Sequence, residues 1–160
     1  MTTDPSAASR YNKTRKTTNQ GGYLMYLEIL KDHHASIYEY IRTINSCHSD
    51  LQVGQQADDI AKALARLAGL ISIHLAAEDK FLYPSLSQSP DDTIRQMAVR
   101  FEQDMGGLAA TFTAYKEAFM TPSKIKADIP KFRQETQRVI GALLERLQRE
   151  DKELYPLVAE

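Results

Sequence analysis

Four polar residues occupy positions where the surrounding helical pattern calls for apolar side chains: His34, His74, Glu78 and Glu150. His74 and Glu78 are four residues apart, so on an α-helix both side chains project from one face and can reach a single ion. A carboxylate buried without a partner is very costly, so it must be neutralised, paired or bound to a metal. The four residues therefore indicate either a metal site or a hydrogen-bonded polar network inside the protein.

The apolar residues around these positions predict four long helices. Leu, Ile, Val and Phe recur three or four positions apart within residues 27–44, 60–81, 101–119 and 139–154. This spacing places them on one inward face of each helix. Gly, Pro, Ser and Asp cluster between these segments, where we expect the chain to turn. Short connections between four such helices favour an all-α fold, an up-down-up-down four-helix bundle.

The ends of the predicted helices are marked by local signals. Residues 1–20 are polar, rich in Ser and Thr and without apolar periodicity, which predicts a flexible N-terminal tail. Residues 21–160, beginning at Gly21-Gly22, are expected to form the bundle. We expect Tyr83-Pro84 and Tyr155-Pro156 to end the second and fourth helices, because proline disfavours helical geometry in the residue before it.

Counting residues along the helices tests whether the polar groups can meet. His34 lies roughly 16 Å into the first helix at 1.5 Å per residue. His74 lies roughly 15 Å from the same end of the bundle, because neighbouring helices run antiparallel. By the same count Glu78 and Glu150 fall within about two turns of this level. The four residues can therefore share one layer.

The segment from His74 to Pro84 is repeated 72 residues later as Arg146 to Pro156. Seven of the eleven positions are identical, namely the Leu, Glu, Asp, Lys, Leu, Tyr and Pro of each copy. The first and third helices match more weakly, with His34 corresponding to Met105. We infer an internal two-helix duplication, which gives the bundle an approximate two-fold axis.

Residues 23–157 resemble the hemerythrin-like, HHE cation-binding domains. The resemblance rests on the run Asp32-His33-His34 and on the HxxxE motif within His74-Leu-Ala-Ala-Glu78. It implies a four-helix bundle in which each half supplies two histidines and a glutamate, and in which the two carboxylates bridge a pair of non-haem irons. Such domains bind or sense dioxygen or nitric oxide, or handle iron.

This chain departs from that pattern in its second half. In the first half His34, His74 and Glu78 match the family's ligands, and Ile37 and Ile41 favour His34 over His33 as the ligand. In the second half Glu150 alone matches, because Met105 and Arg146 occupy the two histidine positions. Methionine is a soft, weak ligand for iron, and arginine stays protonated and does not ligate metals. We therefore predict that the two-metal site is lost.

Two alternatives remain open. Either one iron ion, or less favourably zinc or manganese, is held by His34, His74, Glu78 and Glu150, with dioxygen or nitric oxide as its small ligand. Or the bundle is a metal-free interaction or regulatory module in which Arg146 replaces the second cation, in a forked pair with Glu150 or Glu78. No acid–base pair beyond these residues and no nucleophile triad is evident, so a role as an enzyme is less favoured.

Composition gives weaker expectations about partners and compartment. A net charge of −1 gives no reason to expect nucleic acid or an anionic membrane as a partner, and no protein partner can be inferred. The longest apolar stretch, residues 67–73, is far shorter than a membrane span. Cys47, the one cysteine, cannot form an internal disulfide, so we expect a cytoplasmic protein.

Overall fold

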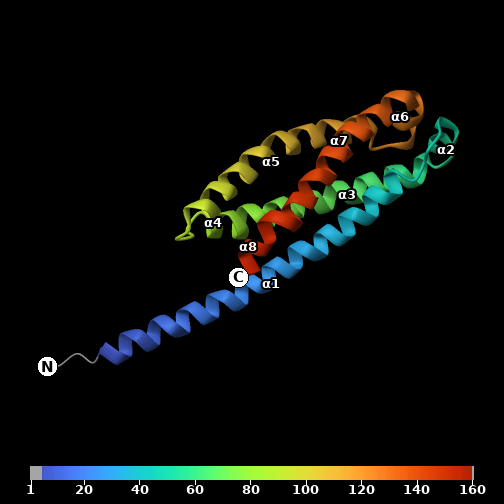
Figure 1. Cartoon of the computed structure of the whole chain (residues 1–160). Coiled ribbons are helices and arrows are strands. Elements are labelled where there is room, and N and C mark those ends of the chain that lie inside the picture. The colour runs from blue at the N-terminus through green and yellow to red at the C-terminus, as the bar shows by residue number, and fades with distance from the viewer. Residues whose placement is uncertain (1–4, 160) are drawn as a thin grey trace.

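The computed structural model describes the backbone of residues 5–159 and the side chains of residues 25–104 and 107–157 (Figure 1). Successive long helices run in opposite directions, so the predicted all-α, up-down-up-down bundle is confirmed. The described backbone contains no strand. The long helices are α1 (Pro5–Ile44), α3 (Ala57–Ala77), α5 (Asp92–Phe119) and α7 (Ile129–Arg149). Short helices lie at the two ends of the bundle: α2 (Asp50–Gln55), α6 (Pro122–Ala127), α4 (Tyr83–Leu86) and α8 (Tyr155–Ala159).

Helix α1 begins at Pro5 rather than at the predicted boundary near residue 21. Its N-terminal part projects beyond the bundle (Figure 1). The reason is local: residues 5–20 include Ala, Arg and Lys, which are good helix formers, and a helix already formed extends at little cost. The predicted flexibility of residues 1–20 stays a prediction, and residues 1–4 lie outside the described part of the chain.

The Tyr-Pro pairs do not end their helices as predicted. Helix α3 continues into α4 through a π-helical turn, η1 (Glu78–Leu82), and α7 continues into α8 through a second one, η2 (Glu150–Leu154). Proline lacks an N–H group and its ring clashes with the carbonyl group four residues before it in an α-helix. The wider π turn lets the helix pass the proline. Both π turns begin at a candidate ligand, and such turns are frequent at functional sites.

The buried side chains form two apolar clusters with a polar layer between them. The larger cluster lies toward the α2 and α6 end and includes Ile37, Leu64, Phe112 and Leu143. The smaller cluster lies toward the α4 and α8 end and includes Leu27, Phe101, Leu154 and Tyr155. The layer between them holds the buried polar side chains of His34, His74, Glu78, Arg146 and Glu150. The predicted common level of the four candidate residues is therefore confirmed.

The continuous helix from Ala57 to Leu86 is long and apolar enough to cross a membrane by length and composition, with 30 residues and a mean hydropathy of 1.5 over an 18-residue window. One such helix is weak evidence for a membrane protein, since a core helix of a soluble bundle has the same composition. Here its inward face carries part of the larger apolar cluster, including Leu64 and Leu67.

Candidate metal centre

Three of the four predicted residues bring their ligand atoms together inside the bundle. The ligand atoms of His34, His74 and Glu150 all lie within 4.8 Å of one another, and all three side chains are buried. The Nε2 atom of His34 is 3.2 Å from Nε2 of His74 and 3.2 Å from Oε2 of Glu150. These residues come from α1, α3 and the first position of η2, so the cluster joins three helices.

Glu78 lies beside this cluster rather than within it. Its Oε1 atom is 3.6 Å from Nε2 of His74 and 3.4 Å from the hydroxyl group of Tyr155. The side chain is 0% exposed. Oε2 of Glu78, Oε2 of Glu150 and Nδ1 of His74 are buried without a hydrogen-bond partner among the described residues. Buried polar atoms are almost always satisfied, so these unpartnered oxygens fit a site that takes a cation.

Asp151 orients the first histidine, a role that the sequence analysis missed. Its Oδ1 atom is 2.7 Å from Nδ1 of His34, and its Oδ2 atom accepts a hydrogen bond of 2.7 Å from the hydroxyl group of Tyr38. An acceptor at Nδ1 keeps the proton there and leaves the lone pair on Nε2, which faces Glu150 and His74. The signal in the sequence was the repeated Glu-Asp-Lys, in which Asp151 is the counterpart of Asp79.

Arg146 completes the polar layer on the side away from the histidines. Its Nε atom donates to Oε1 of Glu150, its Nη1 atom donates to the carbonyl oxygen of Phe101 at 2.8 Å, and its Nη2 atom donates to the Tyr83 hydroxyl group at 2.7 Å. The guanidinium carbon also lies 4.4 Å from the centre of the Phe101 ring. The expected pair with Glu150 is present, through one nitrogen rather than a fork. The side chain of Met105 lies outside the described residues.

A sequence model of the hemerythrin HHE cation-binding domain matches residues 25–158. The chain belongs to this family. No curated protein and no solved structure matches the chain. In this HHE domain the family's first-half residues, His34, His74 and Glu78, lie in one layer with the Glu150 of the second half.

The two glutamates of this HHE domain have opposite protonation tendencies. Burial, reinforced by the negative charge of Glu150, raises the pKa of Glu78 well above its usual value. Burial also tends to raise the pKa of Glu150, but contacts with His34, His74 and Arg146 outweigh it and lower that pKa to about 2. Burial lowers the pKa of His74, which favours the neutral imidazole that a metal requires. Without a metal, the layer therefore favours the protonated form of Glu78 and the ionised form of Glu150 beside Arg146.

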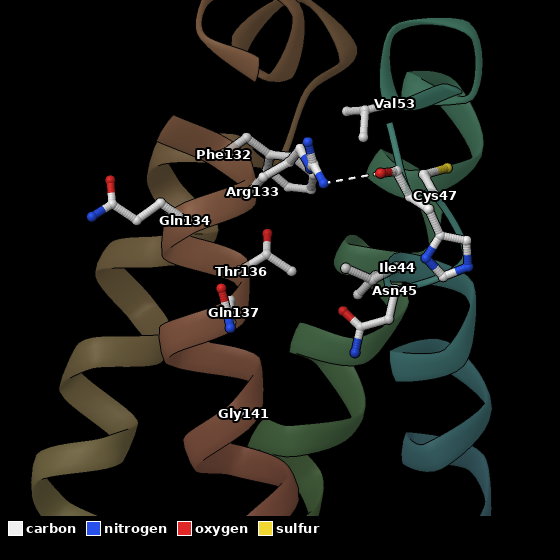
Figure 2. A pocket seen from close by; sticks show the side chains of 11 residues that line it. Ile44, Asn45, Cys47, Val53, Phe132, Arg133, Gln134, Thr136, Gln137 and Gly141 are labelled. Atoms are coloured by element: carbon white, nitrogen blue, oxygen red, sulfur yellow. Dashed lines mark hydrogen bonds between the residues drawn. The ribbon is translucent and has the colours of Figure 1, made fainter. Parts of the chain in front are cut away.

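The remaining histidines lie outside this cluster. His33 is half-buried with its ring centre 5.7 Å from that of His74, while the neighbouring His34 points into the layer, as its register predicts. His48 and Cys47 line a cavity of about 490 Å³ between the end of α1 and the start of α7 (Figure 2). There Arg133 donates to the carbonyl oxygen of His48 at 3.0 Å. This cavity lies beside the larger apolar cluster, so neither residue contributes to the polar layer.

A second cavity adjoins the layer. It has a volume of about 290 Å³ and lies between α5 and α7, where its lining includes Leu108, Arg146 and Arg149. None of the three clustered ligand residues lines it. Arg146 therefore separates this cavity from the histidines.

The raised pKa of Glu78 makes a prediction for the metal-free protein. The unfolded chain ionises near the usual glutamate value of 4.5, whereas the folded protein holds the proton to higher pH. Folding stability contributed by neutral Glu78 is therefore complete below that value and is lost as the pH rises toward the folded-state pKa. The side chain introduced by Glu78→Gln cannot ionise, so the free energy of unfolding of the variant relative to wild type should increase as the pH rises from about 4.5 toward the folded-state pKa of Glu78.

Urea unfolding at several pH values measures this difference. The matched control is Glu145→Gln, which removes the same charge from an exposed position on α7. A constant difference between Glu78→Gln and wild type over the whole range would contradict the assignment of a protonated Glu78.

Proposed function

We propose that this protein binds one iron ion through His34, His74 and Glu150, with Glu78 as a fourth ligand, and uses it in the cytoplasm to sense a small molecule or to take part in an iron-linked stress response. The observation that carries the proposal is the buried cluster of ligand atoms within 4.8 Å, together with the unpartnered carboxylate oxygens of Glu78 and Glu150. Dioxygen and nitric oxide are the small ligands that membership of the family suggests.

The distances between the candidate ligand atoms support a single ion. Ligand bonds of about 2.1 Å place neighbouring ligand atoms about 3.0 Å apart in an octahedral site and about 3.4 Å apart in a tetrahedral one. The two distances of 3.2 Å from Nε2 of His34 fall in this range, and the third, 3.9 Å between Nε2 of His74 and Oε2 of Glu150, is about 0.5 Å wider than the tetrahedral value. Mixed imidazole and carboxylate ligands suit iron, and they also suit zinc or manganese, which we regard as the less favoured ions.

The internal duplication supports the view that the Arg146 guanidinium takes the place of a second cation. Arg146 is the counterpart of His74, and Tyr83 is the counterpart of Tyr155. Each tyrosine contacts the other half: the hydroxyl group of Tyr155, from the second copy of the repeat, lies 3.0 Å from Nε2 of His34. The hydroxyl group of Tyr83, from the first copy, contacts the guanidinium of Arg146 instead. Glu150 lies between the two halves, with one oxygen toward Arg146 and the other toward the histidines.

The second candidate function is a metal-free interaction or regulatory module. One observation favours it: all three nitrogen atoms of the guanidinium of Arg146 have acceptors, so the side of the layer around Arg146 is satisfied without an ion. The side facing the histidines has the hydrogen bond between Tyr155 and His34, but Oε2 of Glu78 and Oε2 of Glu150 are unpartnered there. This difference between the two sides of the layer is the reason to prefer one metal over none.

Metal content distinguishes the two candidates. Protein purified without an affinity tag and reconstituted anaerobically with Fe(II) should hold about one iron per chain, and His74→Ala should hold none, because it removes one of three clustered ligands. Elemental analysis after removal of loose metal gives the ratio. Two irons per chain would contradict the assigned roles of Met105 and Arg146, and no iron would favour the metal-free module.

Asp151 should control the affinity for the metal. Asp151→Asn removes the carboxylate that fixes the proton on Nδ1 of His34, and loss of such an orienting partner costs about 10–100-fold in metal affinity. Competition with a chromophoric chelator measures the change. Asp79→Asn, the equivalent change in the first copy of the repeat, is the control: Asp79 is exposed and should leave the affinity unaltered. Equal effects of the two substitutions would exclude an orienting role for Asp151.

Restoring the two missing histidines should restore a second metal position. The double substitution Met105→His with Arg146→His replaces a weak ligand and a fixed positive charge by two imidazoles. We expect the iron content to rise from about one to about two per chain under the same anaerobic loading. An unchanged ratio in a folded double variant would mean that the second half has repacked beyond its ligand positions.

A further inference from the structure

The hydroxyl group of Tyr155 lies against the candidate metal ligands. It is 3.0 Å from Nε2 of His34 and 3.4 Å from Oε1 of Glu78, and the side chain is 2% exposed. Its ring stacks on the imidazole of His34, with the ring centres 5.0 Å apart and the planes inclined by 30°. The phenol is therefore held by packing with its oxygen directed at the cluster.

The distances place this oxygen at the position of another ligand. A separation of 3.0 Å between the Tyr155 oxygen and Nε2 of His34 matches the spacing of about 3.0 Å between adjacent ligands of one octahedral ion. It is shorter than the 3.2 Å separations of Nε2 of His34 from His74 and from Glu150, and shorter than the 3.9 Å between Nε2 of His74 and Oε2 of Glu150.

Binding of a metal removes the present partner of the Tyr155 hydroxyl group. Because Asp151 holds the proton on Nδ1 of His34, Nε2 accepts the hydrogen bond from Tyr155 when no metal is bound. A metal at the cluster takes that same lone pair. The phenol oxygen then faces the metal, and the next acceptor, Oε1 of Glu78, is 3.4 Å away and is itself a proposed ligand.

A phenolate ligand lets the layer hold a trivalent ion with no more net charge than a divalent one. Glu78 and Glu150 supply two negative charges when ionised, and Arg146 supplies one positive charge, so a divalent ion leaves the layer with a single positive charge. A trivalent ion with a phenolate ligand leaves the same single positive charge. The phenolate therefore offsets the added charge of the ion, which matters in a buried site where uncompensated charge is costly.

We infer that Tyr155 is an oxygen ligand of a ferric ion at this site, an inference that rests on the proposed iron site. When the ligand bond forms, the O–H bond of the phenol breaks, its proton leaves to solvent, and an oxygen lone pair is donated to the ion. No electron is transferred in that step. Tyrosine oxygen is an established ligand of ferric iron in haem proteins, so the chemistry of the donor is suitable.

The duplication supplies a matched control residue. Tyr83 occupies the same position in the first copy of the repeat and is also buried. Its hydroxyl group accepts a hydrogen bond of 2.7 Å from Arg146 rather than facing the histidines. Tyr83→Phe therefore removes an equivalent buried hydroxyl group without removing a proposed ligand.

The experiment compares wild type, Tyr155→Phe and Tyr83→Phe, each loaded anaerobically with Fe(II) and then oxidised with ferricyanide, which removes one electron per iron. Wild type and Tyr83→Phe should show a visible phenolate-to-iron charge-transfer absorption with phenolate bands in resonance Raman spectra, and Tyr155→Phe should show neither. Tyr155→Phe should also bind Fe(III) at least about tenfold more weakly than wild type, as measured by competition with a chelator. Its Zn(II) affinity should change less than its Fe(III) affinity, which also verifies that the histidine cluster has formed.

The possible failures are distinguishable. One iron per wild-type chain without phenolate bands would overturn the role of Tyr155 and leave the proposed iron site standing. Phenolate bands that persist in Tyr155→Phe, or that disappear in Tyr83→Phe alone, would also overturn it. Absence of bound iron from wild type would overturn the proposed function together with this inference. If Tyr155→Phe does not fold, the absence of phenolate bands from wild type still overturns the inference.

Discussion

The structure depends on how the buried carboxylate of Glu150 is compensated. Its side chain is 1% exposed, with Arg146 bonded to one oxygen and the two histidines near the other. Arg146 is buried as well and depends on Glu150, since removing one partner of a buried ion pair costs about 3–5 kcal/mol. Neither residue is stable in the interior alone, so the polar layer forms as one unit. The apolar clusters on either side exclude water from it and strengthen its electrostatic interactions.

The π turns explain how two tyrosines reach this layer. In an α-helix, residues five apart point about 140° away from each other around the axis. In η1 the N–H group of Tyr83 bonds to the carbonyl group of Glu78, five residues earlier, and in η2 Tyr155 bonds in the same way to Glu150. This geometry brings each tyrosine back toward the face of the glutamate that precedes it. The repeated Tyr-Pro sequence thus positions side chains as well as shaping the backbone.

The sequence predicted the bundle and the common level of His34, His74, Glu78 and Glu150 because both follow from regular helical spacing. It did not predict the π turns, since the proline rule applied to them assumes α-helical geometry. It also missed the contact between Asp151 and His34. Asp151 is adjacent to an inward residue, and the seam pattern assigns such a position to the outside; only packing of α1 against the end of α7 brings the two side chains together. Helical periodicity describes the face of one helix, whereas the contact between Asp151 and His34 depends on the distance between two helices.

The guanidinium of Arg146, in the second half of the chain, limits the chemistry of the metal site proposed for the first half. It holds a fixed positive charge, does not change oxidation state and accepts no exogenous ligand. A pair of irons can supply two electrons to bound dioxygen, one from each metal, but a single iron beside Arg146 can supply only one from the ferrous to the ferric state. Under the proposed one-iron site, reversible carriage of dioxygen as a two-electron-reduced species is therefore excluded. Nitric oxide binds to one ferrous ion without requiring two electrons, so under the same proposal this limit does not apply to it.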